Sequence, residues 1–195
     1  MTVPAEDRQL ISELRRGSEA AFLSIYRAHQ GRIFRFALHM TGNRATAEEV
    51  TQEVFLELMR RPRSFEPAKG SLSGYLFGIA RNLARRAAAK NSLDVSLDDF
   101  DDEETSLDLA ADVLTRLSDS EALGALRTAL LGLPEPFREV IILCDLEQIS
   151  YAEAAAAIGC PAGTVASRLY RGHAMLKMKL ARFSSVRTTG EDHDG

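Results

Sequence analysis

The hydrophobic residues of this chain recur at helical spacing along almost its whole length, and no segment alternates polar and apolar residues as a strand would. In the segment 19–40, for example, the apolar residues stand three or four positions apart and define one face of a helix. Glycine and proline interrupt the pattern and mark helix ends. The helices predicted in this way cover residues 7–15, 19–40, 45–61, 72–90, 121–131, 135–147, 151–158 and 161–180. The pattern therefore predicts an all-α protein.

One segment near the C-terminus, SYAEAAAAIGCPAGTVASRLYRGHAMLKMKL (residues 150–180), predicts two helices separated by a sharp turn. Ser150 and Glu153 have the spacing of a capping box, in which each side chain bonds to the backbone N–H of the other residue. Gly159 suits a left-handed helix end, and Pro161 cannot continue that helix but can begin the next. The segment therefore predicts a helix-turn-helix, whose second helix usually enters a DNA groove.

The second helix of this pair has one apolar face and one face suited to DNA. Its apolar stripe comprises Val165, Leu169, Gly172, Leu176 and Leu180. The opposite side comprises Gly163, Ser167, Tyr170, Arg171 and Ala174, with Arg168 on the flank. Arginine can bond to guanine edges, serine to several bases, and tyrosine can pack on a thymine methyl. The alternative is a solvated basic face of a bundle helix, but the capped helix and the turn before it favour DNA binding.

Charge is distributed unevenly along this chain, whose net charge is −4. Residues 1–92 carry a net +6, residues 93–120 a net −9 and residues 121–195 a net −1. Runs of like charge are usually linkers or interaction tails, so the acidic segment is expected to be a flexible linker between two small helical bundles. We expect a first domain over 1–92, a second domain over 121–187 and a disordered tail over 188–195.

The composition is that of an ordinary soluble protein, with 45% hydrophobic and 27% charged residues. The N-terminus does not resemble a signal peptide and no apolar run could span a membrane, so a cytoplasmic protein without membrane contact is expected. Cys144 and Cys160 lack metal-ligand spacing, and the four histidines are scattered. Because no nucleophile–base or carboxylate pair stands out, we expect neither an enzyme nor a bound cofactor or metal.

Five segments resemble, in the same order, those of the extracytoplasmic-function (ECF) sigma factors, the compact sigma-70-family initiation factors of bacterial RNA polymerase. They are AFLSIYRAHQGRIFRFALHMTGN, ATAEEVTQEVFLELMRRPRSF, GYLFGIARNLARR, LPEPFREVIILCDLEQISYAEAAAAIG and CPAGTVASRLYRGHAMLKMKL. The resemblance covers roughly residues 7–183. It implies that 1–92 is region 2, which binds the polymerase clamp and opens the −10 element, and that 121–187 is region 4, which reads the −35 element.

The resemblance also implies partners and binding residues. The partners are core RNA polymerase, at its clamp and flap, promoter DNA and an anti-sigma protein. The polymerase-binding set lies on the outward side of helix 45–61, for which a solvated helix face is the alternative: Glu48, Glu49, Gln52 and Glu53. The −35 set lies on the second helix of the helix-turn-helix: Thr164, Ser167, Arg168, Tyr170, Arg171 and Lys177.

The helix predicted over 72–90 and the loop before it contain the −10 set. The helix has five cations or amides and no acid, which suits contact with phosphates and with one base edge. The resemblance implies that the loop holds a base extruded from the duplex, which needs a pocket with stacking and hydrogen bonds. Tyr75 stands where many relatives have tryptophan and keeps an aromatic surface. The set is Phe65, Lys69, Tyr75, Arg81, Asn82, Arg85 and Arg86.

Some features leave alternatives open. Ala166 stands where relatives often have a cation, and Ala154, in place of a branched residue, is expected to loosen the packing of its helix. The acidic linker either mimics nucleic acid, folds back on the basic surface around Arg81, Arg85 and Arg86, or only joins two bundles that move relative to each other unless a partner holds them. A helix-turn-helix regulator that binds an operator as a dimer, or an adaptor protein, gives no role to AEEVTQEVF and IARN.

Overall fold

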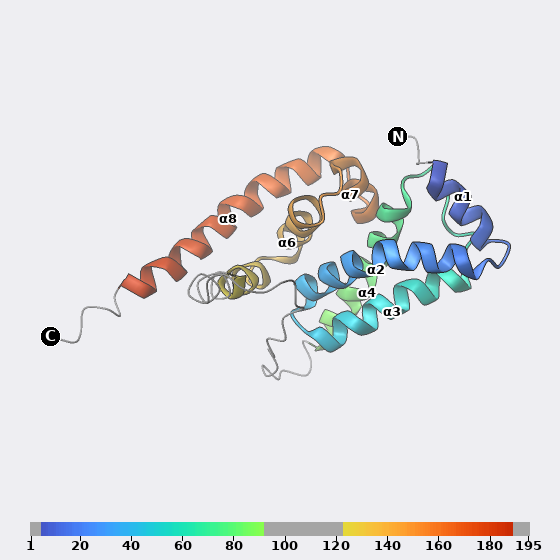
Figure 1. Cartoon of the computed structure of the whole chain (residues 1–195). Helices are drawn as coiled ribbons and strands as arrows, with labels where there is room; N and C mark the ends of the chain where they lie inside the picture. The colour runs from blue at the N-terminus through green and yellow to red at the C-terminus, as the bar shows by residue number, and fades with distance from the viewer. Residues whose placement is uncertain (1–4, 92–122, 189–195) are drawn as a thin grey trace, which may run out of the picture.

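The computed structural model describes residues 5–91 and 123–188, and all regular structure in these two ranges is helical (Figure 1). The first range contains α1 (Ala5–Leu14), α2 (Glu19–Thr41), α3 (Arg44–Arg60) and α4 (Leu72–Asn91). The second contains a helix over 123–131, α6 (Glu135–Ile141), the π-helix η1 (Ile142–Leu146), α7 (Tyr151–Ile158) and α8 (Ala162–Thr188). The all-α prediction is confirmed. The predicted linker 93–120 lies outside the described residues, and of the predicted tail only Thr188 lies within them, as the last residue of α8.

Side chains at the helix ends explain where several helices begin and stop. Ser18 caps α2 by accepting a hydrogen bond from Ala21 N–H at 3.3 Å, and Asn43 caps α3 by accepting one from Thr46 N–H at 2.8 Å. Between them Gly42 adopts a left-handed φ of 71°, which ends α2. The predicted capping box of Ser150 and Glu153 is confirmed at the start of α7, and Gly159 ends that helix with φ 77°.

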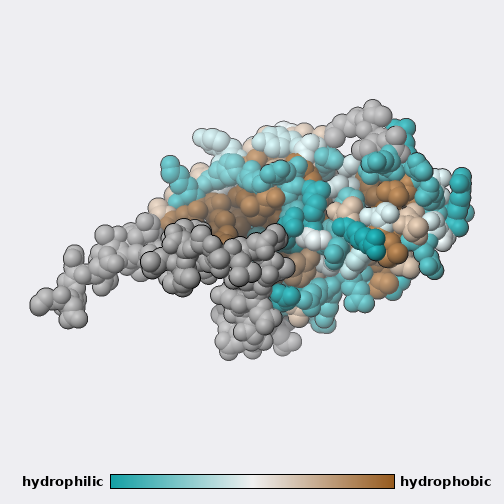
Figure 2. All heavy atoms as spheres, in the orientation of Figure 1, coloured by the Kyte–Doolittle hydropathy of each residue, from teal (hydrophilic) through white to brown (hydrophobic). Residues whose placement is uncertain are grey.

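The first domain is a bundle in which α2, α3 and α4 pack against one another and α1 packs on α2. Its core contains Phe36 and Phe77, whose rings meet edge to face with centroids 5.5 Å apart. In the second domain α8 packs on α6 and α7. The predicted apolar stripe of α8 is buried at Val165, Leu169 and Gly172 and half-buried further along the helix. Figure 2 shows apolar surface gathered on the side of α8 that faces α6.

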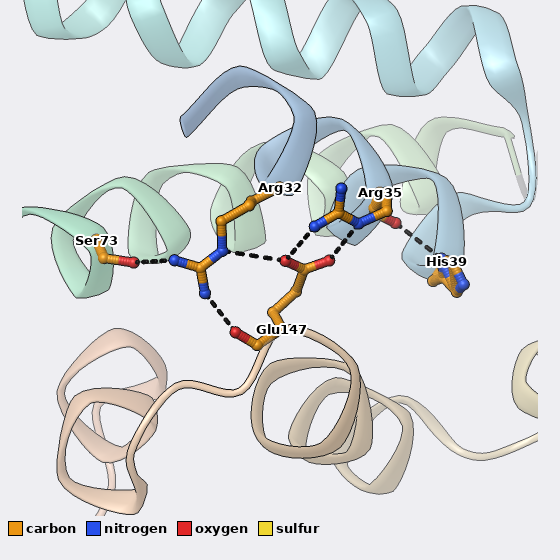
Figure 3. Close-up of polar contacts among 5 residues, drawn as sticks. All are labelled: Arg32, Arg35, His39, Ser73 and Glu147. Carbon is orange, nitrogen blue, oxygen red and sulfur yellow. Dashed lines mark hydrogen bonds and ion pairs between the residues drawn. The ribbon is translucent and has the colours of Figure 1, made fainter. Parts of the chain in front are cut away.

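The segment 135–147 differs from the single α-helix that the sequence predicts. After Ile141 the chain widens into a π-helix, and Glu147 N–H bonds to Ile142 O, five residues back, at 2.9 Å. Gln148 follows with a φ of 51°, which is unusual for a residue other than glycine. This end of the element carries the Glu147 side chain towards α2 of the first domain (Figure 3).

The two domains pack directly against each other, whereas the sequence predicted bundles free to move unless a partner held them. The main contact joins α4 to α7, and α2 also meets α6 and η1. The backbones of α4 and α7 lie close together at Gly78, where a Cβ would be in ordinary van der Waals contact with Ala157 O at 3.6 Å. Ala154 is fully buried on α7, and the expectation that its small side chain loosens the packing of this helix stays a prediction. None of the described helices is both long and apolar enough to cross a membrane.

Candidate nucleic-acid interface

The outward side of α8 presents most of the residues predicted to read DNA. Ser167, Tyr170, Arg171 and Lys177 are exposed, and Tyr170 has 79% of its surface accessible. Ser167 Oγ donates to Thr164 O at 3.1 Å, which ties this hydroxyl to its own helix. These side chains can approach a DNA groove without any change in the packing of α8.

Arg168 differs from its neighbours on α8 because it has an acidic partner. Its Nη1 lies 3.5 Å from Glu139 Oε1, and its side chain is half-buried. Glu139 lies on α6 and is only 1% exposed, so the pair is shielded from solvent on one side. In this structure the guanidinium of Arg168, a residue of the predicted −35 set, therefore contacts a carboxylate of the same domain.

The cations predicted to bind the −10 element on α4 are also paired with acids. Arg81 Nε donates to Glu139 Oε2 at 2.6 Å, and the arginine side chain is only 12% exposed. Arg85 Nε lies 2.6 Å from Glu135 Oε1. Asn82 and Arg86 are exposed on the same helix. The second domain thus covers part of the surface of α4 that the sequence assigns to DNA.

Phe65 lies in the core, which differs from the expectation that its ring stacks on an extruded base. The ring is 2% exposed and lies 5.4 Å from the ring of Tyr75, centroid to centroid. An apolar ring of this size is more stable buried than in a solvated loop. Burial raises the pKa of the Tyr75 phenol, although its hydrogen bond with Ser64 acts in the opposite sense.

A cavity of about 560 Å³ lies between this loop, α4 and α7. Tyr75 and Asn82 line one side, and Ala156 and Ala157 of α7 line the other. Lys69 at its rim pairs with Glu66 at 2.8 Å. The structure therefore brings together four predicted −10 residues around one cavity, Phe65, Lys69, Tyr75 and Asn82, and α7 forms its opposite wall.

Glu153 of α7 connects the helix-turn-helix to the loop before α4. Ser71 Oγ donates to Glu153 Oε1, and Ser150 donates to Glu153 Oε2 from its backbone N–H at 3.1 Å. Burial raises the pKa of Glu153, but the hydrogen bonds from Ser71 and Ser150 outweigh burial and leave the pKa below its ordinary value. Glu153, which forms the capping box of α7 with Ser150, is thus also a contact between the domains.

The predicted polymerase-binding residues lie on α3 beside an apolar groove. Glu48, Glu49 and Gln52 are exposed and Glu53 is partly so; Glu48 pairs with Arg44 at 3.1 Å and Glu53 with Arg60 at 2.6 Å. The groove has a volume of about 470 Å³ and runs between α2 and α3. Its apolar lining, which the sequence analysis did not identify, comprises Phe22, Tyr26, Phe34, Phe55, Leu56 and Met59.

Sequence reasoning also missed a cluster of buried charges between the domains (Figure 3). Glu147 is 1% exposed and accepts hydrogen bonds from Arg32 Nε at 3.3 Å and from Arg35 Nε at 3.1 Å. Arg32 also donates through Nη1 to Ser73 at 3.4 Å and through Nη2 to the backbone oxygen of Glu147. The sequence does contain one signal of this cluster. Glu139 and Glu147 lie in the apolar run FREVIILCDLEQ, and buried carboxylates need cationic or hydrogen-bonding partners.

Two family models match the chain, in order. The first, described as sigma-70 region 2, matches residues 25–93, and the second, described as sigma-70 region 4, matches residues 123–176. The solved structure of CnrH in complex with the cytosolic domain of CnrY has a similar fold. The TM-score is 0.69 at 22% identity, and the match covers 91% of this chain and 99% of CnrH.

Two curated relatives are both named ECF RNA polymerase sigma factors. The ECF RNA polymerase sigma factor SigE of Mycolicibacterium smegmatis is 34% identical over 176 residues, which are 87% of this chain and 66% of SigE. The ECF RNA polymerase sigma factor EcfG of Rhodopseudomonas palustris is 34% identical over 145 residues, which are 74% of this chain and 77% of EcfG. This chain therefore spans about two thirds of the length of SigE and more of EcfG.

Proposed function

Since this chain belongs to the ECF RNA polymerase sigma factors of the sigma-70 family, we propose that it binds core RNA polymerase, directs it to specific promoters and promotes strand opening. The observation that carries this proposal is the capped helix-turn-helix, with Tyr170 and Arg171 exposed on its second helix. In this role the chain acts in the cytoplasm as a transcription initiation factor and not as an enzyme.

The two domains have different binding partners in this role. Residues 1–92 act as region 2, which binds core polymerase and the −10 element, and residues 121–187 act as region 4, which binds the −35 element. In region 4 the exposed side of α8 enters the major groove, where Arg171 can bond to a guanine edge. In region 2 the cavity beside Tyr75 and Asn82 takes an extruded base once α7 has moved away.

Core polymerase binds along α3. The apolar groove between α2 and α3 offers a place for the apolar side of a helix, and Glu48 and Gln52 line the same groove. Glu49 and Glu53 stand close by on α3, so the partner helix carries cations on its flank. An apolar groove with an acidic rim suits a basic protein better than it suits DNA.

An anti-sigma protein is the third partner of this chain. The structural relative CnrH was solved with the cytosolic domain of CnrY bound to it. A protein that binds this chain in the same way holds it inactive until a signal releases it.

Substitutions on α3 test the binding of core polymerase. Replacing Gln52 by Ala and Glu53 by Lys removes an amide and reverses one charge beside the groove. We expect association with purified core enzyme in a pull-down to fall about tenfold or more, as for the loss of a central charged contact. Glu6→Lys is the matched control, because Glu6 is exposed on α1. An unchanged pull-down for the α3 variant would argue against the clamp-binding assignment.

Run-off transcription over a promoter library tests the reading helix. Arg171→Ala is expected to lower promoter use most at particular bases of the −35 element, by about 1–3 kcal/mol. Arg168→Ala is expected to weaken the use of all promoters evenly. It is also expected to lower by about 1 the slope of the logarithm of the DNA-binding constant against the logarithm of the salt concentration. The same base-independent loss for both variants would contradict this division. Specific duplex binding without any run-off product would instead indicate an operator-binding regulator.

A further inference from the structure

Four arginines of the first domain contact the second domain, and we call them the arginine face. Arg32 and Arg35 lie on α2, and Arg81 and Arg85 lie on α4, which packs beside α2. All four are paired with carboxylates that come from the segment 135–147 of the second domain: Glu135, Glu139 and Glu147. At this contact the first domain supplies four cations and the second domain supplies the carboxylates, one of which, Glu139, is also paired with Arg168 of its own domain.

The geometry of these pairs is that of arginine forks on an oxyanion. Arg35 holds both oxygens of Glu147, with Nε to Oε1 and Nη2 to Oε2 each at 3.1 Å (Figure 3). Arg81 holds both oxygens of Glu139 in the same way, at 2.6 and 3.5 Å. A guanidinium presents this edge equally well to a carboxylate and to a phosphate.

In the pairs of Glu139 and Glu147, the carboxylate is more buried than the arginines that hold it. Glu139 and Glu147 are 1% exposed, whereas the side chains of Arg32 and Arg35 keep 32% and 54% of their surface. When the second domain moves away, the carboxylates leave with it: Glu147 becomes solvated, and Glu139 keeps only Arg168 of its own domain. The arginines stay on the rigid bundle of α2 and α4, where their charges have lost their counterions and attract another anion.

We infer that the arginine face is a binding surface for the phosphodiester backbone of DNA, which the carboxylates of α6 and η1 occupy while the two domains are packed together. DNA binding by the first domain and the packing of the domains then exclude each other. This inference rests on the proposed function for its DNA partner, and it adds Arg32 and Arg35 of α2, which the sequence did not single out. Glu139 holds Arg168 of α8 as well, so a single carboxylate neutralises one cation from each DNA-binding helix.

Binding of the whole chain to a short fluorescein-labelled DNA duplex of mixed sequence, followed by anisotropy, tests this inference. The release variant Glu139→Gln with Glu147→Gln keeps the size of both side chains and removes their charges. We expect it to bind the duplex about tenfold more tightly than the unmodified chain at low salt. Adding Arg32→Ala and Arg35→Ala to the release variant is expected to abolish this gain and to lower the salt slope by about 2, one unit for each lost phosphate contact.

Arg8→Ala with Arg27→Ala, added to the release variant, is the matched control. Both residues are exposed on α1 and α2, and both lie outside the arginine face, so the net charge falls equally while the face is intact. Circular dichroism shows whether each variant is folded, and small-angle X-ray scattering shows whether the domains have separated. We expect the release variant to be folded and to have a larger radius of gyration than the unmodified chain.

Three outcomes would overturn the inference. The first is a release variant that does not bind the duplex more tightly than the unmodified chain. The second is an equal loss of duplex binding from the Arg32/Arg35 substitutions and from the Arg8/Arg27 substitutions. The third is poly-glutamate that binds as tightly as the duplex. The last outcome would make an acidic protein segment the occupant. These results are independent of core polymerase, so a chain that supports run-off transcription but fails here keeps its proposed function and loses only the arginine face.

Discussion

Buried glutamates are the residues that most clearly separate this protein from a generic helical bundle. Glu139 and Glu147 lie almost completely out of solvent, where an unpaired carboxylate is strongly unfavourable. Each is satisfied by arginines of the other domain, and replacing such a carboxylate with an apolar residue would leave the guanidinium groups without their partners. These two carboxylates therefore stabilise the folded protein only while the two domains are packed together.

His39 gives the packed form a dependence on pH. It lies on α2 one turn after Arg35, whose backbone oxygen is 2.9 Å from its Nδ1 (Figure 3). Burial, followed by the charges of Arg127 and Arg35, lowers the pKa of His39 from 6.5 to about 4. The unfolded chain therefore binds a proton in a range where the folded protein does not. Stability is fully present above pH 6.5 and decreases as the pH falls towards 4.

We expect the free energy of unfolding to fall by about 1–2 kcal/mol between pH 7 and pH 5 because of His39 alone. His39→Gln has no group that titrates in this range, so it is expected to remove that part of the loss. Urea unfolding of both proteins at the two pH values provides the measurement. An equally steep loss in the variant would show that other groups bind the proton.

At the scale of the elements, α7 has two packing sides although it is only eight residues long. One side packs on α8 to complete the helix-turn-helix, and the other packs on α4 of the first domain. The small side chains of its alanines let α4 and α8 pack closely on α7. On the α4 side of the contact the residues that face α7 include two glycines, Gly74 and Gly78. The alanines in AEAAAAI are therefore explained by the contact between domains and not by the helix-turn-helix alone.

Gly78→Leu is expected to separate the domains without unfolding them. A Cβ at this position already meets Ala157 O at 3.6 Å, so a leucine must displace α7, and such overpacking costs about 1–3 kcal/mol. We expect the radius of gyration from small-angle X-ray scattering to increase while the helical content is unchanged. Gly163→Leu is the matched control, since it also replaces a helical glycine but has nothing within 4 Å of its Cβ position. The same expansion in both variants would contradict the role of this contact.

At the scale of the whole molecule, the domains are joined by a contact that is apolar at α4 and α7 and charged at α2, α4 and α6. The buried residues of both domains belong to one connected cluster. Such a contact makes the stability of each domain depend on the other. The side of α8 that carries Arg171 is exposed, whereas part of the surface of α4 proposed to bind DNA is covered.

We expect the unmodified chain to unfold in a single thermal transition, because Glu147 loses both of its arginines and Glu139 loses Arg81 once the first domain has unfolded. Glu139→Gln with Glu147→Gln is expected to split this transition into two, with the smaller second domain melting first. Differential scanning calorimetry measures both. Two resolved transitions in the unmodified chain would show that the contact is too weak to couple the domains.

The sequence by itself determined the helices, most of their ends and the family. These features depend on residues close together in the chain, such as Ser150 with Glu153 or the glycine that ends α7, and such interactions form locally. The exposed side of α8 followed from the same reasoning, since helical spacing alone separates its apolar stripe from Tyr170 and Arg171.

Only the tertiary structure decided what the charged residues of the interface do. Arg32 and Glu147 are 115 positions apart, and Arg81 and Glu139 are 58 apart, so no local pattern predicts that they meet. The same holds for Phe65, whose aromatic side chain suits either a core or a base until its neighbours are known. Periodicity shows which face of a helix is buried, but the partner of a charge depends on how whole helices are placed, and that placement is set by the packing of α7 on α4.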